Sequence, residues 1–302
     1  MPSAFAADLS DNALLAVTGD DAAAFLHAQF TSDVQALAVG EAQWSGWCTA
    51  KGRLVATFLL LRRPDGFLLM LPAEIAAAFA KRLSMFVLRS RVKIADASAG
   101  IARIGIAGEG ASSLVRARWG EAPAPMKAIE KDGATCVGLG EERFVAFGPA
   151  PLAPAFPPGT RDQWEWALIQ AGIPIVVAAT QEAFVPQMAN LELVGGVSFR
   201  KGCYPGQEIV ARTQYRGILK RRMALAHVAG GERPQPGQSV YSAAFGEQSA
   251  GTIVNAAPAP GGGYDALVVA QIESLERGDL RWRSPDGPAM EVRKAPLPAS
   301  AA

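Results

Sequence analysis

In the first third of the chain, segments with the apolar pattern of a strand alternate with segments that have the apolar pattern of a helix. Short apolar runs predict strands, and stripes with the i, i+3, i+4 spacing predict amphipathic helices. Pro64 and Gly66 separate two of the runs and favour a hairpin turn. Strands and helices therefore alternate in an α+β unit. The predicted elements are strands at 14–17, 54–61, 67–71 and 91–95 and helices at 22–30 and 75–87.

The same order of elements recurs, less regularly, up to residue 171. A connector at 149–158 holds five prolines, which have no amide hydrogen to give to a sheet or a helix. The helix after it carries an apolar stripe from Trp164 to Ala171 and is closed by Gly172. The other predicted elements are strands at 101–107, 134–139 and 143–147 and a helix at 108–119.

Beyond Lys220 the helical spacing gives way to short strand patterns separated by Gly and Pro. A succession of short strands and tight turns is typical of an all-β barrel or sandwich. With 302 residues and 50% hydrophobic composition, the chain is long enough for two or three domains with substantial cores. The predicted strands are 223–228, 238–242, 251–256, 266–272, 281–284 and 290–294.

Composition argues against several classes of function. The 29 Lys and Arg residues balance 28 Asp and Glu, so bulk charge does not favour a nucleic acid or a membrane as partner. The three cysteines lie far apart and form no C-x-x-C pair, which fits free thiols in a reducing compartment. With two histidines the chain offers little for a metal site or a Ser-His triad, and we predict no metal. Without a signal-peptide pattern or a long apolar window, we expect a cytoplasmic protein that does not bind membranes.

The segment 201–208, Lys-Gly-Cys-Tyr-Pro-Gly-Gln-Glu, is the strongest candidate for chemistry. Gly202 and Gly206 accept backbone conformations that other residues avoid, so the segment is suited to presenting the Cys203 thiol. Lys201 and the arginine before it supply positive charge, which can lower a thiol pKa from about 8.5 into the range of about 3.5–7.5. No base adjoins Cys203 in sequence. Its roles as nucleophile, cluster ligand or redox-sensitive thiol therefore stay open, beside that of a small apolar residue in a tight loop.

Two further patterns allow more than one interpretation. The basic residues Arg212, Arg216 and those at 220–222 form either a solvated strand end or a site for carboxylate or phosphate, as on a polyglutamate tail or an RNA backbone. The glycines at 105, 108 and 110 lie between a predicted strand and helix, as in a dinucleotide loop. Their spacing differs from G-x-G-x-x-G, so we reject a dinucleotide site.

The motif at 201–208 resembles the signature of the YgfZ family. These folate-binding proteins are related to the glycine-cleavage T-protein and to a mitochondrial iron–sulfur assembly factor. The resemblance continues in the same order over most of the chain. The matching blocks are 25–34, 51–54, 170–174, 186–191 and 197–199.

This resemblance implies an α+β fold of three domains, arranged in a ring like that of T-protein around a pocket for tetrahydrofolate. Two related, ferredoxin-like α+β domains are expected at 1–97 and 98–217, followed by an antiparallel β-barrel at 218–302. The first domain would bind folate and can be discontinuous. The second would end in the motif.

The chain departs from T-protein at two positions. T-protein carries a pair of aspartates after the glycines of its first hairpin, one of which serves aminomethyl transfer. Residues 53–57 here hold no carboxylate for acid–base chemistry. T-protein also tends to carry a glutamate at the position of Gln170, whose neutral amide can still hydrogen-bond a pterin. The resemblance therefore implies folate binding without aminomethyl transfer.

The resulting hypothesis is a cytoplasmic, tetrahydrofolate-binding accessory protein that supports assembly or repair of iron–sulfur enzymes, such as those that modify tRNA. An enzymatic role of its own is disfavoured. Its partners would be folate and the iron–sulfur client enzymes, without direct binding of nucleic acid. The alternatives are a folate-dependent aminomethyltransferase or demethylase and an RNA-binding or interaction module. The candidate functional residues are Lys201 and Cys203, and the candidate folate contacts are Gln170, Tyr204, Gln207, Glu208 and Arg212.

Overall fold

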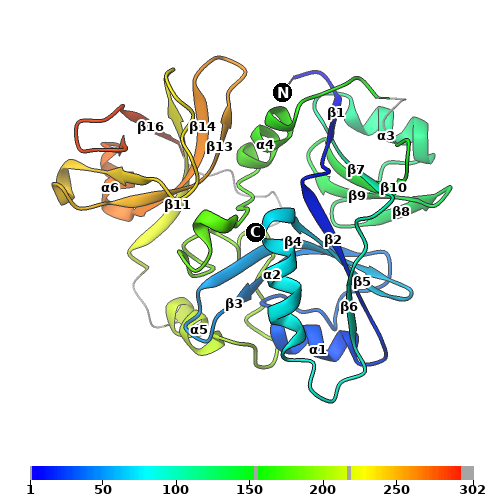
Figure 1. Ribbon diagram of the computed structural model, residues 1–302. Coiled ribbons are helices and arrows are strands. Elements are labelled where there is room, and N and C mark those ends of the chain that lie inside the picture. Colours follow the sequence, from blue (N-terminus) through cyan, green and yellow to red (C-terminus); the bar gives the residue numbers. More distant parts are fainter. Residues whose placement is uncertain (1, 153–155, 216–218, 294–302) are drawn as a thin grey trace. The chain divides into compact units, whose positions relative to one another are not determined.

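The computed structural model describes residues 2–152, 156–215 and 219–293, and Figure 1 follows them along the chain. The chain forms two compact units, each built from several segments. Among the described helices, none is long and apolar enough to span a bilayer. Unit 1 consists of Met1–Ala28, Asp33–Trp44 and Phe58–Ala167, and unit 2 of Gln29–Ser32, Ser45–Thr57 and Leu168–Ala302.

The first sheet, most of whose residues belong to unit 1, has the strand order β3-β4-β5-β2-β6. The predicted hairpin lies within it, with β4 and β5 antiparallel, and β5 pairs along the whole of β2. The hairpin turn needs glycine at position 66, where φ is 145° and a Cβ atom would lie 2.3 Å from the Val17 carbonyl oxygen. Helix α2 buries its apolar face and contacts β2, β5 and β6. The elements are β2 (Asn12–Thr18), α1 (Ala22–Gln29), β3 (Ala42–Cys48), β4 (Leu54–Arg63), β5 (Gly66–Pro72), α2 (Ala73–Ser84) and β6 (Lys93–Asp96).

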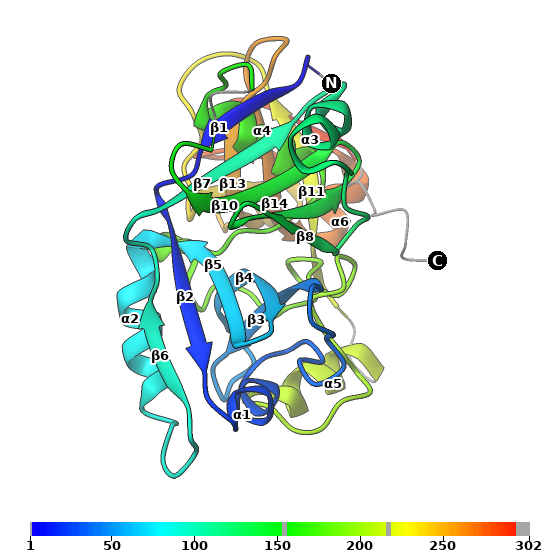
Figure 2. The same ribbon diagram turned by 90° about the vertical axis from the view of Figure 1, so that its right-hand side faces the viewer.

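The second sheet of unit 1 repeats the topology of the first. Read from one edge, its strand order is β8-β9-β10-β7-β1, so β7 to β10 occupy the places that β2 to β5 hold in the first sheet. In both sheets a strand and a helix are followed by three strands (Figure 2). The recurrence of elements predicted from the sequence is thus present in the structure. The elements are β1 (Phe5–Asp8), β7 (Ile101–Ala107), α3 (Ala111–Trp119), β8 (Ala128–Lys131), β9 (Ala134–Gly140), β10 (Arg143–Pro149) and α4 (Arg161–Gln170).

The glycine-rich connection between β7 and α3 serves packing and capping within the chain. A Cβ atom at Gly105 would lie 2.4 Å from the ring of Trp164, so glycine there makes room for the indole. At the start of α3 the Ser112 amide donates to the Glu142 carboxylate over 2.6 Å, and the Ser112 hydroxyl donates to its other oxygen. A carboxylate of this chain therefore lies where a bound phosphate would be held. This agrees with the rejection of a dinucleotide site.

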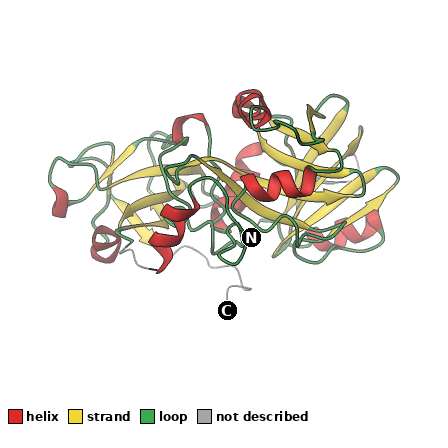
Figure 3. Cartoon of the chain, turned by 90° about the horizontal axis from the view of Figure 1, so that it is seen from below, coloured by secondary structure: helices red, strands yellow, loops and turns green. Residues whose placement is uncertain are grey.

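Unit 2 contains a six-stranded antiparallel sheet with the order β15-β12-β13-β14-β11-β16. Its hydrophobic cluster combines small and branched side chains, such as Val240 and Ile253, with the larger Trp282 and Met290. Figure 3 shows the strands of the chain in yellow and the helices in red. The elements are β11 (Arg221–Val228), β12 (Ser239–Tyr241), β13 (Gly251–Pro258), β14 (Tyr264–Gln271), α6 (Ile272–Arg277), β15 (Arg281–Trp282) and β16 (Met290–Arg293).

The antiparallel β-barrel expected at 218–302 is confirmed only in part, because this sheet is open and forms a half-barrel. Its edges are β15, which has two residues, and β16. Among the described residues, only an isolated bridge between Arg281 and Ala289 joins these edges. Pro288, next to the bridge, lacks the amide hydrogen that a continuing ladder would need. The predicted class of mixed helices and sheets is otherwise confirmed.

Helix α5 (Gln207–Tyr215) was not predicted, and it contains the last two residues of the motif. It starts directly after Gly206, and Val210 is its buried residue. A helix with so little buried surface has no apolar stripe for periodicity to reveal. The domain boundaries expected after residues 97 and 217 stay predictions, and residue 217 lies outside the described part of the chain.

Candidate functional site

Three segments that are distant in sequence meet at the motif, and all three belong to unit 2. The Ser198 amide donates to the Thr31 carbonyl oxygen over 2.8 Å, which joins the motif to the segment 29–32. The Leu54 amide donates to the Phe184 carbonyl oxygen, also over 2.8 Å. Two of the blocks that resemble the family, 25–34 and 197–199, are therefore neighbours in space.

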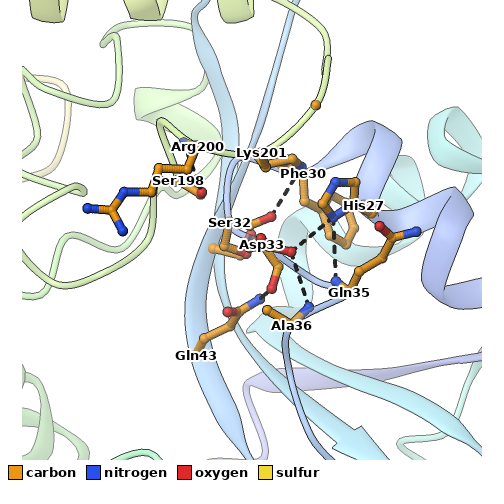
Figure 4. Close-up of polar contacts among 12 residues, drawn as sticks. His27, Phe30, Ser32, Asp33, Gln35, Ala36, Gln43, Ser198, Arg200 and Lys201 are labelled. Carbon is orange, nitrogen blue, oxygen red and sulfur yellow. Dashed lines mark hydrogen bonds and ion pairs between the residues drawn. The ribbon is translucent and has the colours of Figure 1, made fainter.

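Lys201 is buried, and its ammonium group holds the motif against this segment (Figure 4). Its Nζ atom donates to the carbonyl oxygens of Phe30, over 2.5 Å, and Ser32, over 3.1 Å. The same atom lies 5.1 Å from the centre of the Tyr204 ring, within range of a cation–π interaction. An ammonium group has three donors, and here they face backbone oxygens and an aromatic ring. Lys201 therefore positions the motif.

Thr31 completes this connection. Its hydroxyl donates to the Gly196 carbonyl oxygen over 2.5 Å and accepts from the Gly46 amide over 2.9 Å. Together with Ser198 and Lys201, this gives three consecutive carbonyl groups, at residues 30–32, that accept hydrogen bonds from 198–201. Sequence reasoning missed this role, although residues 30–32 fall inside a block that resembles the family.

Cys203 is the exposed one of the three cysteines. A Cβ atom added to the neighbouring Gly202 would have no heavy atom within 4 Å, so the surface beside the thiol is open. Cys48 and Cys136 are buried, and burial raises the pKa of each thiol to about 12. Among the described residues, none is hydrogen-bonded to the Cys203 thiol. The structure therefore presents one accessible thiol without a base of its own.

Gly206 allows the turn at 49–52 to lie against the start of α5. Its φ is 79°, and a Cβ atom there would lie 2.4 Å from the Thr49 carbonyl oxygen. A Cβ atom on Gly52 would in turn lie 3.0 Å from the Cβ atom of Ile209. A side chain at either glycine would push this turn and the helix apart. The glycines thus allow the close approach of two segments that are distant in sequence, 49–52 and 206–209.

The other motif residues divide between the loop and its surface. Gln207 donates from Nε2 to the carbonyl oxygens of Lys201 and Gly202, each over 3.3 Å, and so closes the loop around Cys203. Tyr204 is buried, and burial raises the pKa of its hydroxyl. Glu208 and Arg212 are exposed on α5. Two of the predicted folate contacts, Tyr204 and Gln207, therefore stabilise the loop.

Gln170 belongs to a different hydrogen-bonded network. Its Nε2 atom donates to Oδ2 of Asp265 over 2.8 Å, and Oδ1 of Asp265 lies 2.8 Å from Nδ1 of His227. Asp265 and His227 are paired residues of β14 and β11. Because a carboxylate only accepts, Asp265 fixes the amide orientation and leaves the Gln170 carbonyl oxygen for an N–H donor. Sequence reasoning missed Asp265, whose signal is a buried carboxylate in an otherwise apolar strand.

The segment 53–57 is held by hydrogen bonds that use its polar atoms. The hydroxyl of Thr57, which is buried, donates to the Pro174 carbonyl oxygen and accepts from the Val176 amide, both over 2.9 Å. Arg53 donates to the Ala183 carbonyl oxygen over 2.7 Å. The polar side chains of residues 53–57 therefore stabilise the fold, and the segment contains no carboxylate.

The predicted basic stretch at 212–222 is not a continuous anion site. Arg222 donates to the Gln187 carbonyl oxygen over 2.8 Å and to the carboxylate of Glu192. Burial raises the pKa of Glu192, and the Arg222 charge opposes this shift. Arg212 and Lys220 are exposed, whereas Arg216 lies outside the described residues. Within the described part of the chain, no group of three His, Cys, Asp or Glu residues could hold a metal ion.

Comparisons with known proteins identify relatives of this chain. A family model described as the GCVT N-terminal domain matches residues 3–130. The tRNA-modifying protein YgfZ of Cronobacter sakazakii is 32% identical over 306 residues, which cover 97% of this chain and 92% of that protein. YgfZ of Escherichia coli K12 is 32% identical over 243 residues, covering 77% and 74% of the two chains.

A solved structure shows the same fold. The crystal structure of glycine cleavage system aminomethyltransferase T from Bartonella henselae superposes with a TM-score of 0.76 at 17% identity. The match covers 98% of this chain and 86% of that one. The chain therefore has a T-protein-like mixed α/β fold.

The exposure of Cys203 predicts that one thiol reacts in the folded protein. Ellman's reagent at pH 8 should label one thiol per chain, and all three after denaturation, because Cys48 and Cys136 are buried. The Cys203→Ser variant should show no rapid reaction while folded. Rapid labelling of that variant would contradict the assignment of Cys203 as the accessible thiol.

The Lys201 contacts predict that Lys201→Met lowers the free energy of unfolding by about 2–4 kcal/mol, because two charge-assisted hydrogen bonds are lost. Lys201→Arg should not restore stability, since the larger planar guanidinium does not fit a buried position occupied by one compact ammonium group. Urea denaturation measures both, with Lys220→Met, an exposed lysine of the same unit, as control. Equal stability of Lys201→Met and the control would show that Lys201 does not hold the motif.

Proposed function

The chain belongs to the YgfZ family of tRNA-modifying proteins, and from this we propose that it is a tetrahydrofolate-binding accessory protein. It supports the assembly or repair of iron–sulfur enzymes, including enzymes that modify tRNA. The observation that carries the proposal is the exposed Cys203 thiol, held in place by a buried Lys201 on a T-protein-like fold. A thiol presented in this way is suited to contact another molecule.

The residues around Gln170 fit the polar edge of a pterin. That edge carries ring and exocyclic N–H donors, and the oriented carbonyl oxygen of Gln170 is an acceptor for them. Arg212, exposed on α5, is a candidate partner for the carboxylates of the folate tail. Bound tetrahydrofolate supplies a carrier of one-carbon units. The chain's own contribution is to orient the pterin through Gln170 and to present the thiol of Cys203.

Aminomethyl transfer is the weaker candidate function. It is suggested by the fold shared with aminomethyltransferase T, but a fold alone does not establish an activity. Residues 53–57 supply no carboxylate, and the hydroxyl of Thr57 is already used by Pro174 and Val176. Activation of the Cys203 thiol within the chain would also need a base beside it. An accessory role therefore accounts better for these residues.

The partners follow from this role. Folate and iron–sulfur client enzymes are the proposed partners, and the cytoplasm is the proposed compartment. Direct RNA binding has less support, because Arg222 is hydrogen-bonded within the chain. Arg222 is one of the five basic residues at 212–222 that gave the reason to consider RNA.

Complementation tests the proposed function. In a bacterial strain lacking its own YgfZ protein, the wild-type chain should restore the tRNA modifications that depend on iron–sulfur enzymes, measured by mass spectrometry of nucleosides. Cys203→Ala should restore less than about a tenth of that level, whereas Cys136→Ala, which removes a buried thiol, should restore most of it. Full restoration by Cys203→Ala would remove the thiol from the function. Formation of methylene-tetrahydrofolate from a methylated amine by the purified protein would instead favour the aminomethyltransferase.

The orientation of Gln170 gives a separate prediction. In Asp265→Asn the new amide can donate as well as accept, so the Gln170 amide is no longer fixed. The Kd for tetrahydrofolate should rise about tenfold, which corresponds to about 1.4 kcal/mol. Isothermal titration calorimetry measures this, with Asp286→Asn, an exposed aspartate of the same unit, as control. An unchanged Kd in Asp265→Asn would show that Asp265 does not position a folate contact.

A further inference from the structure

Exposed apolar side chains gather at one place in unit 1. Six large apolar residues are exposed in the described part of the chain, and three of them lie within four positions at the end of α2. We refer to these three as the 85–88 patch. They lie in the turn that joins α2 to β6, which projects away from the strands of unit 1 (Figure 2). The patch consists of Met85, exposed to 71%, Phe86, to 45%, and Leu88, to 87%.

The fold of unit 1 does not need these side chains in its core. Helix α2 already buries Ile75, Ala76, Phe79 and Leu83 against the sheet. The turn itself is held by backbone hydrogen bonds, from the Met85 amide to Arg82 and from the Val87 amide to Ser84. A cluster of exposed apolar residues beyond the needs of the core is typical of an interaction surface.

Positive charge surrounds the patch. Residues 75–95 contain five basic side chains and no acidic one, and all five are exposed. One of them, Arg91, pairs with Asp20 over 3.0 Å, and Asp21 lies 3.8 Å from it. The rim therefore keeps an excess of positive charge. The five basic residues are Lys81, Arg82, Arg89, Arg91 and Lys93.

We propose that the 85–88 patch is a docking surface for a partner protein that presents an apolar pocket rimmed by Asp and Glu. The apolar side chains would supply the buried centre of the interface, and the basic rim would orient an acidic partner and speed its association. The surface belongs to unit 1, whereas Cys203 belongs to unit 2, so the proposal does not depend on the folate site.

Other occupants fit the patch less well. A second copy of the chain would bring two basic rims together, which is repulsive. Single-stranded nucleic acid binds to platforms on which successive bases stack, whereas Phe86 is the one aromatic side chain among the three residues of the patch. Within the described residues no backbone hydrogen bond reaches the carbonyl groups of Met85, Val87 or Leu88. In a bilayer these groups would lose water without replacement, while a protein partner can donate to them.

Photo-crosslinking in cells tests the occupant. The full chain carries p-benzoylphenylalanine in place of Leu88 or, as a control, in place of Val39, another exposed apolar residue of unit 1. We expect a covalent adduct with another protein from position 88 and not from position 39. An adduct removed by nuclease, an adduct with a phospholipid, an adduct with a second copy of the chain, or the same adduct from both positions would overturn the proposal. Absence of any adduct would overturn it as well.

Binding measurements with the purified partner then test whether the apolar side chains and the basic rim hold it. The protein identified by mass spectrometry should bind the wild-type chain more weakly as salt rises. Its affinity should fall at least tenfold for Lys81→Glu combined with Arg89→Glu, and also for Met85→Ser combined with Leu88→Ser. An affinity unchanged in either double variant would contradict the proposal. Thermal unfolding and tetrahydrofolate titration of the same variants show that the fold is intact, and a failure of folate binding in the wild type would leave this test unaffected.

Discussion

A buried ammonium group set against backbone carbonyls is the interaction on which the candidate site depends. A charge removed from water is costly unless it is fully hydrogen-bonded, and Lys201 meets this requirement through Phe30, Ser32 and the ring of Tyr204. Separation of these segments would leave the charge without partners. The loop that carries Cys203 is therefore held by a buried side chain, that of Lys201, although the thiol itself is exposed.

The polar groups near the site are used mainly to orient other groups. Lys201 holds the motif, Asp265 orients the amide of Gln170, and Thr57 joins its strand to the segment 174–176. This division of roles leaves Cys203 as the group open to another molecule. It fits the proposed accessory role, in which the thiol contacts a partner.

The sequence predicts the features of this structure that depend on local side-chain patterns, and not those that depend on backbone groups or on residues far apart in the chain. The hairpin of β4 and β5 follows from its apolar runs and from Pro64 and Gly66, and the candidate thiol follows from its motif. Helix α5 was missed because it buries a single residue, Val210, and so shows no apolar stripe in the sequence. The sheet does not close into a barrel because β15, with two residues, is too short to continue the ladder. The acceptors of Lys201 are backbone carbonyls, which leave no trace in side-chain patterns. The pairing of Gln170 with Asp265 joins residues 95 positions apart, beyond the reach of periodicity.

The most direct measurement is a calorimetric titration of tetrahydrofolate into the purified wild-type chain at neutral pH. We expect one saturable site per chain, with quenching of tryptophan fluorescence over the same concentration range. No saturable heat and no quenching at high micromolar tetrahydrofolate would show that the chain does not bind tetrahydrofolate.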